Sequence, residues 1–241
     1  MILTADGGTG AGSLSLVHGT VAEIWRYPVK SMAGERLESC LVAATGLEGD
    51  RRWALIDGKA NRAGKPLTIR ETDLLLTYRA RLAGGGVQVV TPGGETRPLD
   101  ERLVADLAAE TSRPLTLREG AGLNFDDSPV LVVNLATVAA FELSAGVEID
   151  RRRFRANLYL EDLEPEEELR WLGRRIRTGA AELEVVSRCE RCVVITRDPD
   201  TTQASPALLR VLTEMSDTCM GVYCRVTQSG MVATGDPCGP G

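Results

Sequence analysis

Residues 182–198 read ELEVVSRCERCVVITRD, and this stretch gives the clearest indication of how the chain folds. Apolar and polar residues alternate in the part that leads to Cys189, and an apolar run follows Cys192. Alternation with a period of two is typical of a half-buried strand, and a short apolar run is typical of a buried one. The stretch therefore predicts a strand, a turn that carries the two cysteines, and a second strand.

Short strand patterns continue on both sides of this stretch. They cover residues 21–29, 37–45, 51–57 and 153–162, while residues 77–94 and 221–237 have the turn-rich form of hairpins. Apolar residues recur at helical spacing in residues 100–112, 134–146 and 205–215, with Asp100 and Ser205 as expected N-caps. Many short strands with a few inserted helices predict an α+β fold with a β-rich, barrel-like core.

The composition excludes several classes of partner. The chain has 241 residues and a net charge of −6, so it lacks the basic footprint of a nucleic-acid-binding protein. No stretch approaches the roughly 18 to 20 apolar residues that span a bilayer, which argues against a membrane protein. Residues 1–17 do not have the basic and apolar regions of a signal peptide and predict a flexible tail. We expect a cytoplasmic protein.

The β pattern changes in the middle of the chain. A Gly-Gly turn and a charged helix near residues 95–125 separate two strand-rich sections. We therefore predict a smaller N-terminal β subdomain over residues 18–110 and a second domain over residues 111–241.

Cysteine is the main reactive residue type of the chain, because the single histidine lies next to the tail. Cys189 and Cys192 can bind zinc, exchange disulfides or simply pack inside strands. A zinc site would need Cys219 and Cys224 as further ligands, and the spacing of that second pair is unusual for zinc. Arg191 precedes Cys192, and a guanidinium beside a thiol favours the thiolate that binds soft metals.

Two clusters of cationic residues indicate an anion site. Lys30 and Ser31 follow a strand that ends at Pro28, and Arg51 stands next to Asp50. A lysine, a hydroxyl and a guanidinium together supply a point charge, a hydrogen-bond donor and a bidentate fork for phosphate. The alternative is a solvated turn with a surface ion pair.

The sequence DRRRFR at residues 150–155 is a third cationic segment. Residues 151–153 are interpreted as a solvated face. On a strand over residues 153–162, Phe154 and Arg155 would alternate, so that one of them points inward.

Six motifs in series resemble the MOSC proteins (molybdenum cofactor sulfurase C-terminal domain). They are YPVKSMAG at 27–34, GLEGDRRWALID at 46–57, SPVLVVN at 128–134, RFRANLYL at 153–160, CERCVVITRDPDT at 189–201 and TGDP at 234–237. In their two-part layout they are similar to the subgroup of the mitochondrial amidoxime-reducing component and its bacterial relatives. The resemblance implies a β-rich MOSC core preceded by a MOSC N-terminal β subdomain.

The resemblance also implies a molybdenum–pyranopterin cofactor (Mo-molybdopterin). Its metal would take the thiolate of Cys192, the second cysteine of the motif, as metal ligand and catalytic residue. Lys30, Ser31 and Arg51 would anchor the cofactor phosphate. The implied contacts on the pterin side are Ser128, Arg155, Asn157 and Arg191. Cys189 would be structural.

The function implied by the family is an oxidoreductase that reduces N-hydroxylated or N-oxide compounds by oxygen-atom transfer to molybdenum. Two alternatives stay open: a non-catalytic carrier of the cofactor or of persulfide sulfur, and pathway-specific oxygen transfer in specialised metabolism. Glu190 and the segment from Thr202 to Leu208 depart from the family pattern where relatives shape substrate access.

Electrons would have to come from a partner, because the sequence has no flavin, nucleotide, ferredoxin or haem fingerprint. We expect a separate ferredoxin-type or haem-type electron-transfer protein with its reductase, a small-molecule N-oxygenated substrate and a monomeric enzyme.

Overall fold

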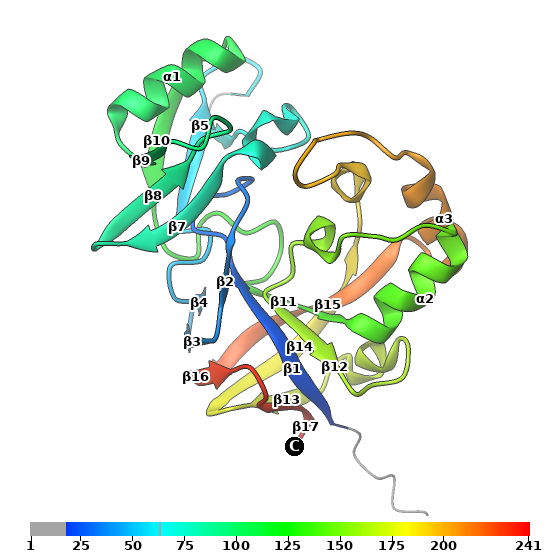
Figure 1. Cartoon of the computed structure of the whole chain (residues 1–241). Coiled ribbons are helices and arrows are strands. Elements are labelled where there is room, and N and C mark those ends of the chain that lie inside the picture. The colour runs from blue at the N-terminus through cyan, green and yellow to red at the C-terminus, as the bar shows by residue number, and fades with distance from the viewer. Residues whose placement is uncertain (1–17, 63) are drawn as a thin grey trace, which may run out of the picture.

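The computed structural model describes residues 18–62 and 64–241, so the predicted tail at 1–17 lies outside the described residues (Figure 1). Seven strands of the largest sheet close into a barrel, because β1 pairs with both β12 and β17. Around the ring they are β12 (Leu158–Glu161), β11 (Val130–Asn134), β15 (Cys219–Gln228), β14 (Ala181–Glu190), β13 (Arg175–Thr178), β17 (Pro237–Pro240) and β1 (Gly19–Arg26), and β2 (Glu35–Leu37) extends β1. The predicted β-rich, barrel-like α+β fold is confirmed.

Apolar side chains fill the inside of the barrel. Val21 and Ile24 of β1, Leu183 of β14 and Val222 of β15 are fully buried there. Successive side chains of a strand point to opposite faces, so the alternation seen in the sequence places one apolar set inside the ring. The core is therefore a packed interior without a channel for ligand.

Two helices cover the outer face of the barrel beside a second apolar core (Figure 1). The helix α2 (Leu135–Ala145) follows Asn134, whose side chain accepts the N–H of Ala136 at 2.9 Å, and it ends at Gly146 as predicted. The helix α3 (Ala207–Ser216) has Pro206 as its N-cap, so the prediction of a Ser205 side-chain cap was wrong. Ser205 contributes its carbonyl, which accepts the N–H of Leu208.

Three small sheets complete the fold. Their strands are β3 (Ser39–Ala43), β4 (Gly46–Leu47), β5 (Trp53–Asp57), β6 (Lys65–Pro66), β7 (Arg79–Ala83), β8 (Gly86–Val90), β9 (Thr96–Pro98), β10 (Leu115–Glu119) and β16 (Gly230–Ala233). The sheets of β10, β5 and β6 and of β7, β8 and β9 surround a third apolar core, while the sheet of β16, β3 and β4 packs on the barrel core. The predicted hairpin is β7 with β8. The predicted helix is α1 (Glu101–Thr111), and Asp100 caps it by accepting the N–H of Leu103 at 3.0 Å.

Some strands pair across the predicted subdomain limit. The strand β10, which begins after residue 110, pairs with β5, while β1 and β2 belong to the barrel sheet. The limit at residue 110 stays a prediction.

The expected final hairpin at 221–237 does not form. Both edges of β15 are already paired, with β11 on one side and β14 on the other, so the following strand β16 pairs with β3 instead. A strand pattern in the sequence cannot show that both edges of its neighbour are occupied.

Of two further predicted strands, the one at 153–162 forms only over residues 158–161, and the one after Cys192 does not form, because 3₁₀ turns replace strand at these places. The turn η2 (Arg151–Phe154) is capped by Asp150, and Arg155 then has a φ of 52° in the left-handed region. The turn η4 (Val193–Thr196) follows Cys192 in place of a second strand. Phe154 and Arg155 therefore do not alternate on a strand. Two other turns are η1 (Asp73–Thr77) and η3 (Glu167–Trp171).

Candidate functional site

A cavity of about 380 Å³ lies where the N-terminal part meets the barrel. The structure brings together in its wall every residue that the sequence predicted for the site. They are Lys30, Ser31, Arg51, Ser128, Arg155, Asn157, Arg191 and Cys192. Their positions span 163 residues of sequence, so only the closed fold makes them neighbours.

Lys30 and Ser31 enter the cavity from the segment that follows β1. The Lys30 Nζ donates to the carbonyl of Asn124 at 2.6 Å and to Asp126 Oδ1 at 2.9 Å. Burial lowers the pKa of Lys30, and the nearby Asp126 carboxylate opposes that shift. Ser31 has a φ of 72°, a left-handed conformation that a non-glycine residue seldom adopts. Such strained backbone is common at binding sites.

Arg51 is fixed by several contacts at the bottom of the cavity. It forms an ion pair with the buried Asp50, and its Nη2 donates to the carbonyl of Arg155 at 2.9 Å. Its Nη1 donates to Asn157 Oδ1 at 3.2 Å. The same Asn157 oxygen accepts the N–H of Leu131 at 3.1 Å. The Asn157 side chain thus holds Arg51 and strand β11 in place as well as lining the cavity.

Arg155 differs from Arg51, because no carboxylate of the described residues forms an ion pair with its guanidinium. Across residues 18–62 and 64–241, no hydrogen bond or ion pair of the Arg155 guanidinium is found, and its close contact is the ring of Tyr27 at 4.5 Å. Burial lowers the pKa of Arg155 to about 10, and the nearby Arg51 charge adds to the effect. An anion in the cavity would relieve this repulsion.

The sequence predicted that the Arg191 guanidinium lies beside the Cys192 thiol, but its hydrogen bonds go to other groups. Its Nε donates to the carbonyl of Met220 at 2.9 Å and its Nη1 to the carbonyl of Phe154 at 2.7 Å. Its Nη2 is buried without a hydrogen-bond partner in the described structure. A buried guanidinium nitrogen without a partner is costly and marks a place for an acceptor from outside the chain.

The guanidinium beside the Cys192 sulfur is that of Arg70, which sequence reasoning missed. Arg70 lies beside the half-buried Cys192, and its Nη1 lies 3.8 Å from Asp126 Oδ1. Burial opposes the shift, but the charges of Cys192 and Asp126 raise the pKa of Arg70. Arg70 comes from the N-terminal part, 122 positions before Cys192. Nothing in its local sequence indicates that contact.

Ser128 lines the cavity, and the cysteines other than Cys192 do not gather around it. The Ser128 hydroxyl donates to Asp127 Oδ1 at 2.7 Å. Cys189 is buried next to Tyr223, which hydrogen-bonds to it. Cys224 lies inside the barrel, away from the Cys192 cavity, so the four cysteines do not converge. In the part of the chain that the structure describes, no group of three or more His, Cys, Asp or Glu is placed to hold a metal ion.

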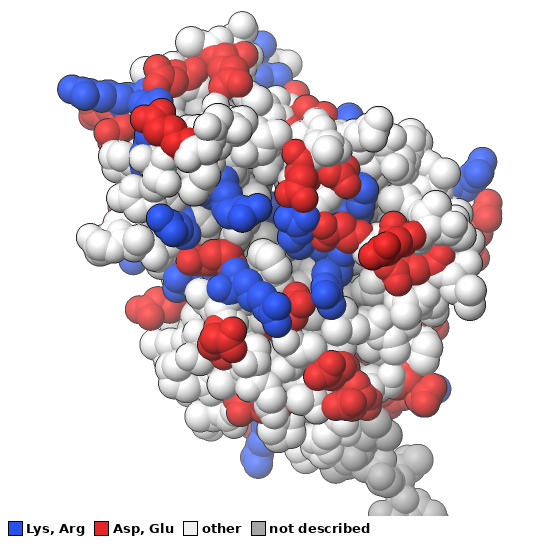
Figure 2. Space-filling model, in the orientation of Figure 1, with Lys and Arg blue, Asp and Glu red and all other residues white. Residues whose placement is uncertain are grey.

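Positive charge dominates the cavity although the chain as a whole carries −6. Three acidic residues line it, namely Asp126, Asp127 and Glu190, against seven basic ones: Lys30, Arg51, Arg70, Arg153, Arg155, Arg188 and Arg191. Figure 2 shows basic side chains gathered across the middle of one face, with acidic side chains among them. The cavity is therefore suited to an anionic ligand.

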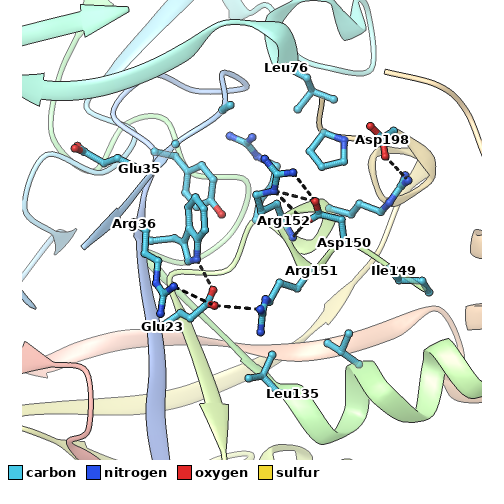
Figure 3. Close-up of a pocket in the computed structure, with 18 of the residues that line it drawn as sticks. Glu23, Glu35, Arg36, Leu76, Leu135, Ile149, Asp150, Arg151, Arg152 and Asp198 are labelled. Carbon is cyan, nitrogen blue, oxygen red and sulfur yellow. Dashed lines mark hydrogen bonds and ion pairs between the residues drawn. The ribbon is translucent and has the colours of Figure 1, made fainter. Parts of the chain in front are cut away.

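A larger cleft of about 1110 Å³ adjoins this cavity and shares Arg153 and Arg155 with it (Figure 3). Glu23 lies in this cleft, where it accepts the indole N–H of Trp25 at 2.7 Å and faces Arg151 at 3.3 Å. Cys192 is not among the residues that line the cleft.

No helix in the described part of the chain is long and apolar enough to cross a membrane. All six cysteines are free thiols. A thiol that stays reduced can serve as a thiolate ligand or nucleophile.

Known proteins are similar to this chain over most of its length. The chain is 27% identical to the molybdenum cofactor sulfurase of Caenorhabditis elegans over 86% of its own length, which is 33% of that protein. It is 26% identical to the human mitochondrial amidoxime reducing component 2, over 91% of this chain and 82% of that protein. The chain thus spans about a third of the sulfurase.

The fold is similar to the YuaD protein of Bacillus subtilis, with a TM-score of 0.54 and 15% identity, over 93% of this chain and 96% of that one. The MOSC N-terminal beta barrel domain matches residues 18–126, and the MOSC domain matches residues 117–238. Since these two matches run in order across the described sequence, the chain belongs to the MOSC domain family.

Proposed function

We propose that this protein binds a molybdenum–pyranopterin cofactor through the Cys192 thiolate and uses it to reduce N-hydroxylated or N-oxide compounds. The observation that carries the proposal is the convergence of a half-buried thiol with an excess of cationic side chains in one cavity. A thiolate is the side-chain donor that suits a soft metal centre, and the cationic wall suits a phosphate. The similarity to the human amidoxime reducing component supports the reaction class.

The residues present fit such a cofactor. Two guanidinium groups in the wall lack acceptors within the described chain, the whole group of Arg155 and the Nη2 of Arg191. Both would gain hydrogen bonds from polar atoms of the pterin and its phosphate. In this proposal Lys30, Ser31 and Arg51 hold the phosphate, and Ser128, Arg155, Asn157 and Arg191 line the pterin side.

When bound, the cofactor would supply the redox metal that takes part in oxygen-atom transfer. The chain's own residues orient it and tune its surroundings. Arg70 places a positive charge beside the Cys192 sulfur. Asp126, Asp127 and Glu190 lie in the same wall. The Glu190 carboxylate would accept a hydrogen bond from a cationic nitrogen compound and repel an anionic one at its own place in the wall.

The overall reaction consumes two electrons and two protons for each N–OH group and releases the amine and water. In this proposal the electrons come from a separate ferredoxin-type or haem-type carrier with its reductase. We also infer a cytoplasmic, reducing compartment, which is consistent with six free thiols.

Metal analysis and turnover test this proposal together. The purified protein should contain molybdenum, and with NADH and an N-hydroxylated amidine it should show no turnover. Reduced methyl viologen as an artificial one-electron donor should restore turnover. Turnover with NADH alone would contradict the need for a partner, and stoichiometric zinc with four sulfur ligands would overturn the cofactor assignment.

A second function is favoured by one observation, the similarity to a molybdenum cofactor sulfurase over 86% of the chain. In that case the chain would carry the cofactor, or a persulfide on Cys192, without turning over a substrate. Full molybdenum occupancy combined with no turnover from any donor would support this carrier. A persulfide on Cys192, detected as an added mass of one sulfur, would identify its cargo.

A further inference from the structure

Tyr27 brings two cationic groups of the cavity together. Its ring centroid lies 4.7 Å from the guanidinium carbon of Arg51 and 4.5 Å from that of Arg155. The ring is 2% exposed, and Trp25 stacks beside it with centroids 6.4 Å apart. The negative face of an aromatic ring attracts a guanidinium, and the attraction grows when the pair is shielded from water. One buried ring therefore contacts two like charges that would otherwise repel each other.

The two guanidinium groups depend on this ring to different degrees. Arg51 is also held by Asp50, Asn157 and the carbonyl of Arg155. For Arg155, the ring of Tyr27 is the close side-chain contact found in the described structure. Removal of the ring would leave Arg51 anchored and would free Arg155 to move.

The hydroxyl of Tyr27 contributes little to this arrangement. It is buried and has no hydrogen-bond partner among the described residues. Burial raises the pKa of Tyr27 to about 12, so the ring stays neutral at physiological pH. A buried hydroxyl without a partner costs stability, and its removal is neutral or favourable. The contribution of Tyr27 thus resides in the ring.

We propose that Tyr27 is a positioning residue of the anion site: its ring holds the pterin-side Arg155 beside Arg51, so that the charge of Arg155 adds to the attraction of a phosphate bound at Arg51. The inference rests on the proposed function for the identity of the natural ligand. The geometry itself does not depend on that identity, since any phosphate in the cavity would meet the same two groups.

The test measures the affinity of cofactor-free protein for inorganic phosphate by titration calorimetry at fixed ionic strength. Tyr27→Phe should bind phosphate as the parent does and should be equally or more stable. Tyr27→Leu and the longer Tyr27→Met should bind about tenfold more weakly, which corresponds to the loss of one desolvated cation–π contact. Cofactor retention through dialysis in the loaded proteins should follow the same order.

Two controls separate positioning from general destabilisation. Tyr78 is also buried, and it lies in the core of the N-terminal part with its hydroxyl bonded to Glu110. Tyr78→Leu should lower the melting temperature while leaving phosphate affinity unchanged. In an Arg155→Met background, Tyr27→Met should cause little further loss, because the group that the ring positions is already absent.

The possible outcomes distinguish an error in the role of Tyr27 from an error in the anion site itself. If Tyr27→Phe binds as weakly as Tyr27→Met, the hydroxyl matters and the inference is wrong. The inference is also wrong if Tyr27→Met retains parental affinity. Should the parent fail to bind phosphate, or should Arg51→Ala bind as the parent does, the anion site of the proposed function is itself overturned, and the role of Tyr27 with it.

Discussion

The cleft and the cavity differ in the balance of charge in their walls, and not only in volume. The larger cleft measures about 1110 Å³, yet its wall has six acidic and six basic residues. The smaller cavity measures about 380 Å³ and has three acidic and seven basic residues. Carboxylates in the cleft are already engaged: Glu23 faces Arg151, Asp150 binds Arg152, and Asp198 binds Arg153. An excess of unpaired charge, rather than volume, therefore distinguishes the candidate binding site.

The difference follows from whether a cation already has a carboxylate partner. A cation that is paired with a carboxylate has little to gain from an added anion, while an uncompensated buried cation has much to gain. Arg153 and Arg155 border both the cleft and the cavity, but Arg153 pairs with Asp198 at 3.0 Å and Arg155 has no such partner. The comparison predicts that substitutions of cations in the cavity impair ligand retention, and that substitutions of the paired charges that line only the cleft affect stability alone.

The largest effect is expected from the thiol of the cavity. Cys192→Ser should abolish activity and change the spectroscopic signature of the metal, because a hydroxyl is a harder ligand than a thiolate. Cys189→Ser is the matched control: Cys189 is buried outside the barrel core beside Tyr223, and its loss should cost less. Equal metal content and full activity in Cys192→Ser would contradict the assignment of the thiolate.

The next largest effect on cofactor retention is expected from a cation of the cavity, compared with a cation of the cleft. Arg51→Ala should lower cofactor retention on the order of tenfold or more, since it removes charge-assisted hydrogen bonds worth about 1.5 to 3 kcal/mol each. Arg151→Ala removes a cation from the cleft and should leave retention unchanged. Molybdenum content after dialysis measures both variants. If the two variants lose cofactor equally, charge excess does not mark the site.

A change in the cleft should reduce stability without touching the cavity. Glu23 is 6% exposed and accepts the indole N–H of Trp25 while it faces Arg36 and Arg151. Glu23→Gln should lower the free energy of unfolding by about 1 to 3 kcal/mol, because two guanidiniums lose a buried counter-charge.

Urea denaturation measures this effect, and Glu119→Gln is its control. The ion pair of Glu119 with Arg52 is exposed on both sides, so its loss should cost less than about 1 kcal/mol. A loss of cofactor retention in Glu23→Gln would show that the cleft takes part in binding.

The smallest expected effect is a pH dependence of anion binding. Burial lowers the pKa of Lys30, and a bound phosphate favours its charged form. Phosphate affinity should therefore fall as the pH rises through this lowered pKa, by less than about tenfold per pH unit. Lys30→Arg keeps its charge throughout this range and should lose the dependence. An unchanged profile in Lys30→Arg would show that Lys30 does not contact the anion.

Much of the fold could be predicted from local patterns. The helices at 101–111 and 135–145 were predicted from apolar residues at helical spacing, the first together with its N-cap Asp100. Strands β1, β5 and the hairpin of β7 with β8 were predicted for the same kind of reason. The turns η2 and η4 were missed, since the left-handed conformation of Arg155 and the 3₁₀ turn after Cys192 are set by packing.

The sequence by itself determined eight residues of the cavity, because the serial motifs of a family resemblance carry them: YPVKS, GDRRW, SPVLVVN, RFRAN and CERC. Only the tertiary structure decided how these residues act on one another. It placed Arg70 rather than Arg191 against the Cys192 sulfur, and it turned Asn157 toward Arg51. Hydrogen bonds act over about 3 Å and are set by side-chain direction, so adjacency along the chain does not decide them. The closure of the seven-stranded barrel against the N-terminal sheets decides these hydrogen bonds.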